Sequence, residues 1–208
     1  MATIDPTLWL LFVAATVGFI FTPGPIVSLI VAESLRDGPK HGLAVVAGAT
    51  LVSLIYLSVN YFGFSAVADL PPGVLTTIRY AGVLYLLYLS AQAFLKPVHI
   101  VNPDMPPVSA PLWVSFSKSA VICFTSPKTI LFFAAFFPQF VSADLPTQPQ
   151  LLILSATFLI IAAMLDMTWV LIAATAKKWL TQKNKLATAN KIAGSVLAAG
   201  AITLLLIN

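Results

Sequence analysis

The sequence predicts an all-α membrane protein of six transmembrane helices, built as two inverted three-helix repeats with helices 1 and 4 broken by proline. Three observations lead to this prediction: extreme hydrophobicity, six long apolar segments, and a proline-containing interruption in the first helix of each half. Of the 208 residues, 59% are hydrophobic and 9% are charged, whereas a soluble domain carries about 25% charged residues. A soluble core of this size cannot hide so much apolar surface, so the chain is expected in a bilayer.

Six stretches are long enough to cross a bilayer, which takes about 20 apolar residues per helix. They run over residues 8–33, 42–67, 74–95, 112–140, 151–176 and 189–207. Because the loops between them are short, residues 1–208 are expected to form a single transmembrane domain. A gap at 96–111 contains five prolines and divides the chain into repeats of about 1–96 and 111–208.

Basic residues predict the orientation, because cytoplasmic loops of membrane proteins carry an excess of Lys and Arg. They gather around the loops after the first, third and fifth segments: Arg36, Lys40, Lys96, Lys118, Lys177, Lys178, Lys183, Lys185 and Lys191. These loops are therefore expected in the cytoplasm and both termini outside, in an inner or plasma membrane. The same assignment explains the net charge of +4 without a nucleic-acid partner.

Short sequence matches relate the two halves of the chain. Phe-Thr-Pro-Gly-Pro at 21–25 interrupts the first segment, and Phe-Thr-Ser-Pro-Lys at 124–128 interrupts the fourth. The third and sixth segments both begin with a basic residue, any residue, Ala and Gly. Since each half has an odd number of helices, the two halves must enter the membrane from opposite sides.

The interruptions predict a binding site. Proline lacks the backbone N–H and clashes with the preceding turn, and an unpaired backbone group in hydrocarbon costs several kcal/mol. Breaks at matching places of inverted repeats are typical of transporter sites, whereas a lone break is more simply a packing kink. The predicted substrate-binding residues are Thr22, Pro23, Gly24, Pro25, Ser126, Pro127 and Lys128.

Charged residues inside the apolar segments are the other candidates. Asp166 lies near the middle of the fifth segment, where ionisable residues are rare and usually functional. We expect it to load and release a proton during transport, and the alternative is a structural ion pair with Lys128. Lys128 itself is expected to meet a substrate carboxylate or to extend toward water. Glu33, at the end of the first segment, is expected to be solvated.

Enzymatic function is not expected. His41 and His99 are the two histidines and both fall in predicted cytoplasmic loops, and the chain contains no HExxH motif and no GxxxxGK loop. The single cysteine, Cys123, argues against a thiol-electron carrier and a cysteine-built metal pathway. We therefore expect no catalytic residue, no metal site and no cofactor. A metal-cation exporter with oxygen ligands and a non-transporting membrane scaffold stay open as alternatives.

Three stretches resemble the LysE/RhtB family of amino-acid exporters. They are TPGP at 22–25 followed by SLRDGPKHGLAVVAGA at 34–49, FTSPKTILFFAAFFPQF at 124–140, and NKIAGSVLAAGA at 190–201. The resemblance implies six helices and export of amino acids or related small metabolites in exchange for protons. Ile26 departs from the family, in which Asn often follows PGP, and this leaves the substrate open. The sequence also leaves open whether the chain forms a homo-oligomer.

Overall fold

The computed structural model describes residues 3–22, 24–68, 72–95 and 110–175, together with residues 191, 195, 198–199 and 201–202. Within these ranges every regular element is helical. The predicted sixth segment and the lysines at 177–185 lie mostly or wholly outside the described residues. Pro23 also lies outside them.

The described helices follow the first five predicted segments. In chain order they are α1 (Pro6–Phe21), α2 (Pro25–Asp37), α3 (Pro39–Ala68), α4 (Pro72–Leu95), α5 (Leu112–Thr125), α6 (Pro127–Leu131), the π-helical turn η1 (Phe132–Phe136), the 3-10 turn η2 (Phe137–Phe140) and α7 (Thr147–Thr175). Five of these helices begin at a proline, namely α1, α2, α3, α4 and α6. Proline is favoured there because the first N–H of a helix has no partner within the helix.

Both predicted helix breaks are present. The axes of α1 and α2 bend by 52° across the first break, and the helices before and after Ser126 bend by 54° across the second. Thr22 and Ser126 are extended, with ψ of 116° and 119°, so α-helical geometry stops at each of them. The Thr22 N–H and hydroxyl both donate to the Gly18 carbonyl, at 3.0 and 2.6 Å.

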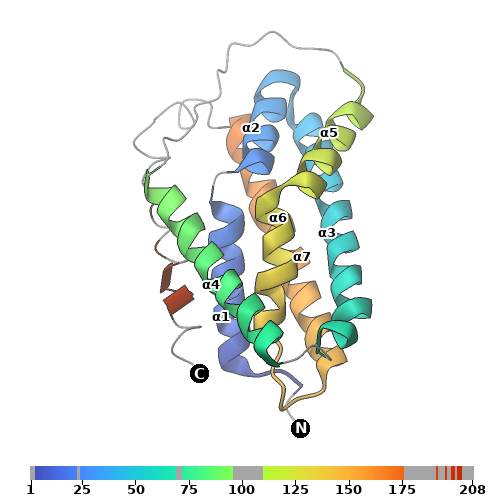
Figure 1. The fold of residues 1–208 in the computed structure, drawn as a ribbon. Helices are drawn as coiled ribbons and strands as arrows, with labels where there is room; N and C mark the ends of the chain where they lie inside the picture. Colours follow the sequence, from blue (N-terminus) through green and yellow to red (C-terminus); the bar gives the residue numbers. More distant parts are fainter. Residues whose placement is uncertain are drawn as a thin grey trace.

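The helices lie side by side as a bundle (Figure 1), with α2 and α5 at one end and the starts of α1 and α7 at the other. Residues Pro39–Phe64 of α3 and all of α7 are long and apolar enough to cross a membrane. Counting each bent pair as one span gives up to four spans in the described residues. This supports a multi-pass membrane protein, while six spans and the inverted repeat stay predictions.

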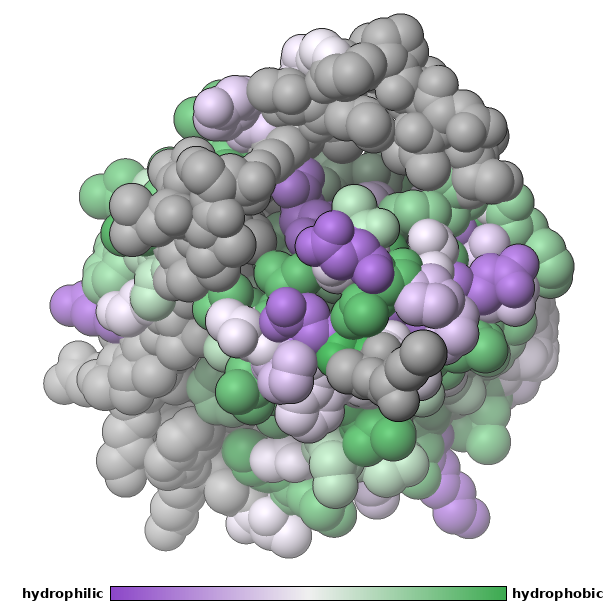
Figure 2. Space-filling model, turned by 90° about the horizontal axis from the view of Figure 1, so that it is seen from below, coloured by the Kyte–Doolittle hydropathy of each residue, from purple (hydrophilic) through white to green (hydrophobic). Residues whose placement is uncertain are grey.

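Seen from the end where α1 and α7 begin, hydrophilic residues gather near the middle of the molecule, with hydrophobic residues among and around them (Figure 2). Large apolar side chains are exposed on the helices themselves, for example Leu10 at 60%, Val59 at 62% and Leu171 at 63%. Exposed apolar side chains on the flanks suit contact with lipid.

A cluster of phenylalanines fills the core between α1, η1, η2 and α7. Its buried members are Phe12, Phe19, Phe132, Phe133, Phe136, Phe137, Phe140 and Phe158. Phe12 meets Phe137 and Phe140 edge-on, with ring centroids 5.6 and 5.2 Å apart, and Phe19 stacks on Phe132 at 4.0 Å. Aromatic pairs of this kind contribute about 0.5–1.5 kcal/mol each beyond the area they bury. The cluster therefore anchors α1 to the helices of the second half.

The two halves also meet where α3 packs against α5. Gly48 lies so close to α5 that a Cβ there would collide with the Phe116 carbonyl oxygen. Nearby, the Ser119 hydroxyl donates to the Val45 carbonyl at 2.6 Å. A small residue at the crossing is what allows two helix backbones to approach this closely in a membrane.

Candidate functional site

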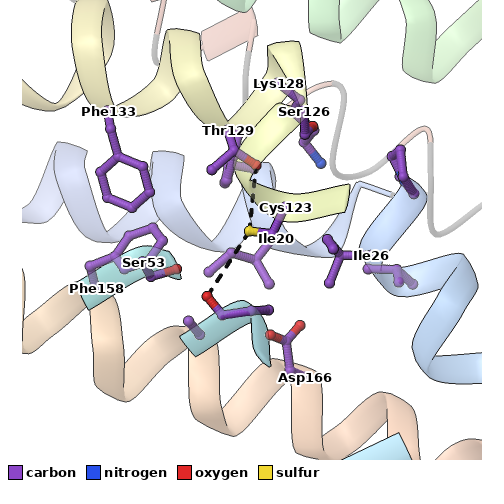
Figure 3. A pocket seen from close by; sticks show the side chains of 16 residues that line it. Ile20, Ile26, Ser53, Cys123, Ser126, Lys128, Thr129, Phe133, Phe158 and Asp166 are labelled. Carbon is purple, nitrogen blue, oxygen red and sulfur yellow. Dashed lines mark hydrogen bonds between the residues drawn. The ribbon is translucent and has the colours of Figure 1, made fainter. Parts of the chain in front are cut away.

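A cavity of about 70 Å³ lies where the two helix breaks come together. Its wall is built from α1, the start of α2, α3, the end of α5, α6, η1 and α7 (Figure 3). A cavity needs about 10–15 Å³ to hold one water, so this cavity is large enough to be hydrated. Both halves of the chain contribute to it.

Four of the seven predicted substrate-binding residues lie on the wall: Gly24, Pro25, Ser126 and Lys128. Thr22 lies behind the wall, 6% exposed, and reaches the site through its carbonyl oxygen. Pro127 begins α6 and is exposed on the outside of the cavity. The structure therefore brings the two breaks together, although not every residue of each break faces the cavity.

Lys128 enters the cavity from α6. Its Nζ donates to the Thr22 carbonyl oxygen at 2.9 Å and lies 4.6 Å from the centroid of the Phe19 ring. A residue of the second break thus satisfies a carbonyl at the first break, where the hydrogen bonding of α1 ends. The side chain therefore turns toward the cavity and the first helix break. An ammonium group has three donors, so Lys128 can bind a further acceptor within the cavity.

Asp166 lies on α7, on the opposite side of the cavity from Lys128 (Figure 3). It is 8% exposed. Its carboxylate makes no hydrogen bond and no direct ion pair with the described residues, but the Lys128 ammonium acts on it electrostatically from across the cavity. A buried carboxyl group without a hydrogen-bond donor among the described residues is suited to accept a proton or a cationic group of a ligand.

The wall between these two residues is mainly apolar. Ile20, Ile26, Phe133 and Phe158 all point toward the cavity (Figure 3). On α7, Phe158, Ala162 and Asp166 follow one another at intervals of four residues and so share one face of the helix. Sequence reasoning missed this wall, although the four-residue spacing before Asp166 is a signal that could have identified part of it.

Cys123 lies on the wall near the end of α5. Its Sγ lies 3.9 Å from the Thr129 hydroxyl oxygen and 4.0 Å from the Ala49 carbonyl oxygen. Dashed lines mark these contacts in Figure 3. The residue is 4% exposed. These two oxygens are the polar partners of the weakly polar thiol. Because Cys123 lies on the cavity wall, its reaction with thiol reagents can report access to the cavity.

A second polar cluster lies at the end of the bundle formed by α2 and α5. Glu33 is 3% exposed, so the expectation of a solvated residue is wrong. Its carboxylate accepts from the Ser115 hydroxyl at 2.8 Å and from Lys118 Nζ at 3.2 Å, and it pairs with Arg36 at 3.1 Å. His41 Nδ1 lies 3.0 Å from the Ser115 hydroxyl oxygen. These partners compensate for burying the carboxylate.

The same cluster includes a group of potential metal ligands. Single ligand atoms of Glu33, Asp37 and His41 lie within 4.8 Å of one another. Arg36, however, pairs with both carboxylates, at 3.1 and 2.8 Å, and Lys118 pairs with Glu33. Because these cations already neutralise the carboxylates and would repel a metal ion, we assign no metal site here.

Comparison with known proteins covers nearly the whole chain. The family model for LysE type translocators matches residues 17–207. The leucine efflux protein of Salmonella choleraesuis is 26% identical over 177 residues, which cover 85% of this chain and 84% of that protein. An uncharacterized membrane protein of Bacillus subtilis, YrhP, is 27% identical, covering 86% of this chain and 89% of its own. An uncharacterized membrane protein of Vibrio cholerae is 26% identical over 194 residues, which cover 92% of this chain and 93% of that protein. No solved structure matches the chain.

The matched range takes in both helix breaks, every residue named above on the cavity wall, and the polar cluster around Glu33. The resemblance noted in the sequence is therefore confirmed at the level of the family. Because the family model matches nearly the whole chain, this multi-pass membrane protein belongs to the LysE type translocator family.

Proposed function

We propose that the chain is a secondary active exporter that carries amino acids with apolar side chains across an inner or plasma membrane in exchange for protons. The observation that carries the proposal is the placement of Lys128 and Asp166 on opposite sides of a mainly apolar cavity. A zwitterionic amino acid has the matching form, with a carboxylate, an ammonium group and an apolar side chain. The family and the similarity to a leucine efflux protein support the same class of cargo.

In this proposal the cargo carboxylate binds at Lys128. The start of α2 lies on the same wall, at Gly24 and Pro25, and Gly24 offers no side chain to cap the first N–H groups of that helix. Unpaired N–H groups and the positive end of the helix dipole both favour an anion there. Ile26, in place of an amide, makes the adjoining surface apolar, which suits a hydrocarbon side chain better than a polar one.

Asp166 binds the cargo ammonium group in one state and a proton in the other. Since the carboxyl group is buried and makes no hydrogen bond or direct ion pair with the described residues, either cation can bind to it directly. The two bends of 52° and 54° support an arrangement in which the halves rock around the cavity to open it on alternate sides. Both termini would then lie outside the cytoplasm. A metal cation is the weaker alternative, because Lys128 places a positive charge on the wall.

Counterflow in proteoliposomes tests this function. Vesicles loaded with unlabelled leucine should accumulate radiolabelled leucine, and external isoleucine or valine should compete. Leucine methyl ester lacks the carboxylate and 4-methylpentanoate lacks the ammonium group, so each should compete at least about tenfold more weakly than leucine, as expected for one lost charged hydrogen bond. Protein-free liposomes are the control. If leucine shows no counterflow, and isoleucine and valine show none when tested in its place, the proposal is wrong.

A further inference from the structure

We propose that Glu33, Ser115 and Lys118 form a latch between α2 and α5, which closes the cavity toward the cytoplasm and must open in each transport cycle. Because only a transporter has to open its cavity to each side in turn, the latch rests on the proposed function. It assigns a role to a polar cluster that takes no part in binding the cargo.

The bonds of the latch join the two halves of the chain. Glu33 belongs to α2 in the first half, and Ser115 and Lys118 belong to α5 in the second. Two charged hydrogen bonds, of 2.8 and 3.2 Å, connect them. Glu33 accepts both of these bonds. Its carboxylate is buried, whereas the Lys118 side chain is 44% exposed, so the latch lies at the edge of the helix bundle.

The position of the latch relative to the cavity gives it this role. Val27 of α2 and Cys123 of α5 lie on the cavity wall. Glu33 is six residues beyond Val27, and Lys118 is five residues before Cys123, which correspond to about 9 and 8 Å along a helix. The latch therefore lies one to two helical turns from the cavity, on the side where Arg36 and Lys118 predict the cytoplasm.

The two breaks provide the hinges for opening. α2 begins immediately after the first break, and α5 ends immediately before the second. Each helix can therefore tilt about its break without carrying α1 or α6 along with it. α5 is also held to α3 by the close approach at Gly48 and the bond from Ser119. α2 also packs closely on α3, where a Cβ on Gly42 would collide with the Ser34 hydroxyl. Opening is thus expected as a tilt of α2 and α5 relative to each other, with the bonds to Glu33 broken.

Access to Cys123 tests the latch. It is the single cysteine of the chain and lies on the cavity wall. A small membrane-impermeant methanethiosulfonate converts its thiol to a mixed disulfide and releases methanesulfinate, so the rate of this modification reports how often the cavity opens. The rate is measured in inverted membrane vesicles, where the reagent meets the cytoplasmic face, and in spheroplasts, where it meets the other face. The variants are Glu33→Gln and Lys118→Met. The matched control is Ser117→Ala, because among the described residues the Ser117 hydroxyl donates to the Val114 carbonyl of its own helix, at 3.1 Å.

Loss of one charged hydrogen bond should raise the rate in inverted vesicles by about tenfold, equivalent to about 1.4 kcal/mol in the opening equilibrium. The rate in spheroplasts should not rise, and Ser117→Ala should match the unmodified chain on both faces. Lys118→Met keeps the test valid if Glu33→Gln fails to fold. Unchanged rates in both variants, or an equal rise from both faces, would overturn the latch. Since no cargo is added, the result is independent of which amino acid is carried.

Discussion

Replacing Gly48 with alanine should push α3 and α5 apart. The new Cβ would collide with the Phe116 carbonyl oxygen and lie 3.0 Å from the Ser119 Cβ and 3.2 Å from the Ala120 nitrogen. Two of these three atoms belong to the backbone of α5 and cannot rotate away, so the helix itself must shift. Gly63 provides a matched control on the same helix, because a Cβ there would meet nothing within 4 Å.

The difference in stability between the two variants can be worked out from these contacts. Alanine gains about 0.8–1.0 kcal/mol over glycine in a helix, and this gain cancels when Gly48→Ala is compared with Gly63→Ala. Overpacking at Gly48 costs about 1–3 kcal/mol. A displaced hydrogen bond between Ser119 and Val45 adds about 0.5–1.5 kcal/mol. The free energy of unfolding should therefore be about 1.5–4.5 kcal/mol lower for Gly48→Ala than for Gly63→Ala.

Thermal unfolding in detergent measures this difference, with a thiol-reactive fluorophore that reacts with Cys123 as it becomes exposed. Cys123 is 4% exposed in the folded chain, so the signal starts low. For a chain of this size 1 kcal/mol corresponds to about 2–4 °C, so the midpoint of Gly48→Ala should lie at least about 3 °C below that of Gly63→Ala. Equal midpoints, or a higher midpoint for Gly48→Ala, would refute the close contact between α3 and α5.

Two further predictions concern topology and cargo size. In a Cys123→Ser background, Thr3→Cys and Asn208→Cys should react with an impermeant thiol reagent applied to intact spheroplasts; reaction only in inverted vesicles would reverse the proposed orientation. Ala162→Leu should narrow the cavity and weaken competition by leucine by about 10–200-fold while alanine still competes. Ala163→Leu, whose side chain is not on the wall, is the control, and an unchanged preference for leucine in Ala162→Leu would contradict this binding mode.

The helix breaks could be predicted because proline acts through its own backbone. A missing N–H and a ring that clashes with the preceding turn interrupt a helix whatever surrounds it. The expected interruptions at 22–25 and 124–128 therefore appear, as bends of 52° and 54°. The length of each apolar run is also a local property of the sequence. It located the ends of the first five predicted segments to within about four residues.

The partners of the charged residues could not be predicted, because they come from distant parts of the chain. Glu33 looks solvated in the sequence since it ends an apolar run, yet α5 buries it with side chains 82 and 85 residues away. Lys128 and Asp166 look like a pair because both lie within apolar segments. In the structure the Thr22 carbonyl takes the ammonium group instead. Local pattern shows that a buried charge needs a partner, but only packing determines which one.

Exchange of a proton for the cargo ammonium group at Asp166 is the step on which the proposed transport depends. Asp166→Asn keeps the shape and the hydrogen-bonding capacity of the side chain but cannot titrate. The decisive measurement compares leucine flux driven by a pH gradient with leucine–leucine exchange, in proteoliposomes of Asp166→Asn and of the unmodified chain, each normalised to folded protein. Flux driven by the pH gradient should be lost, while exchange should persist in part at raised leucine concentration. Undiminished flux driven by the pH gradient in Asp166→Asn would contradict the proposed mechanism.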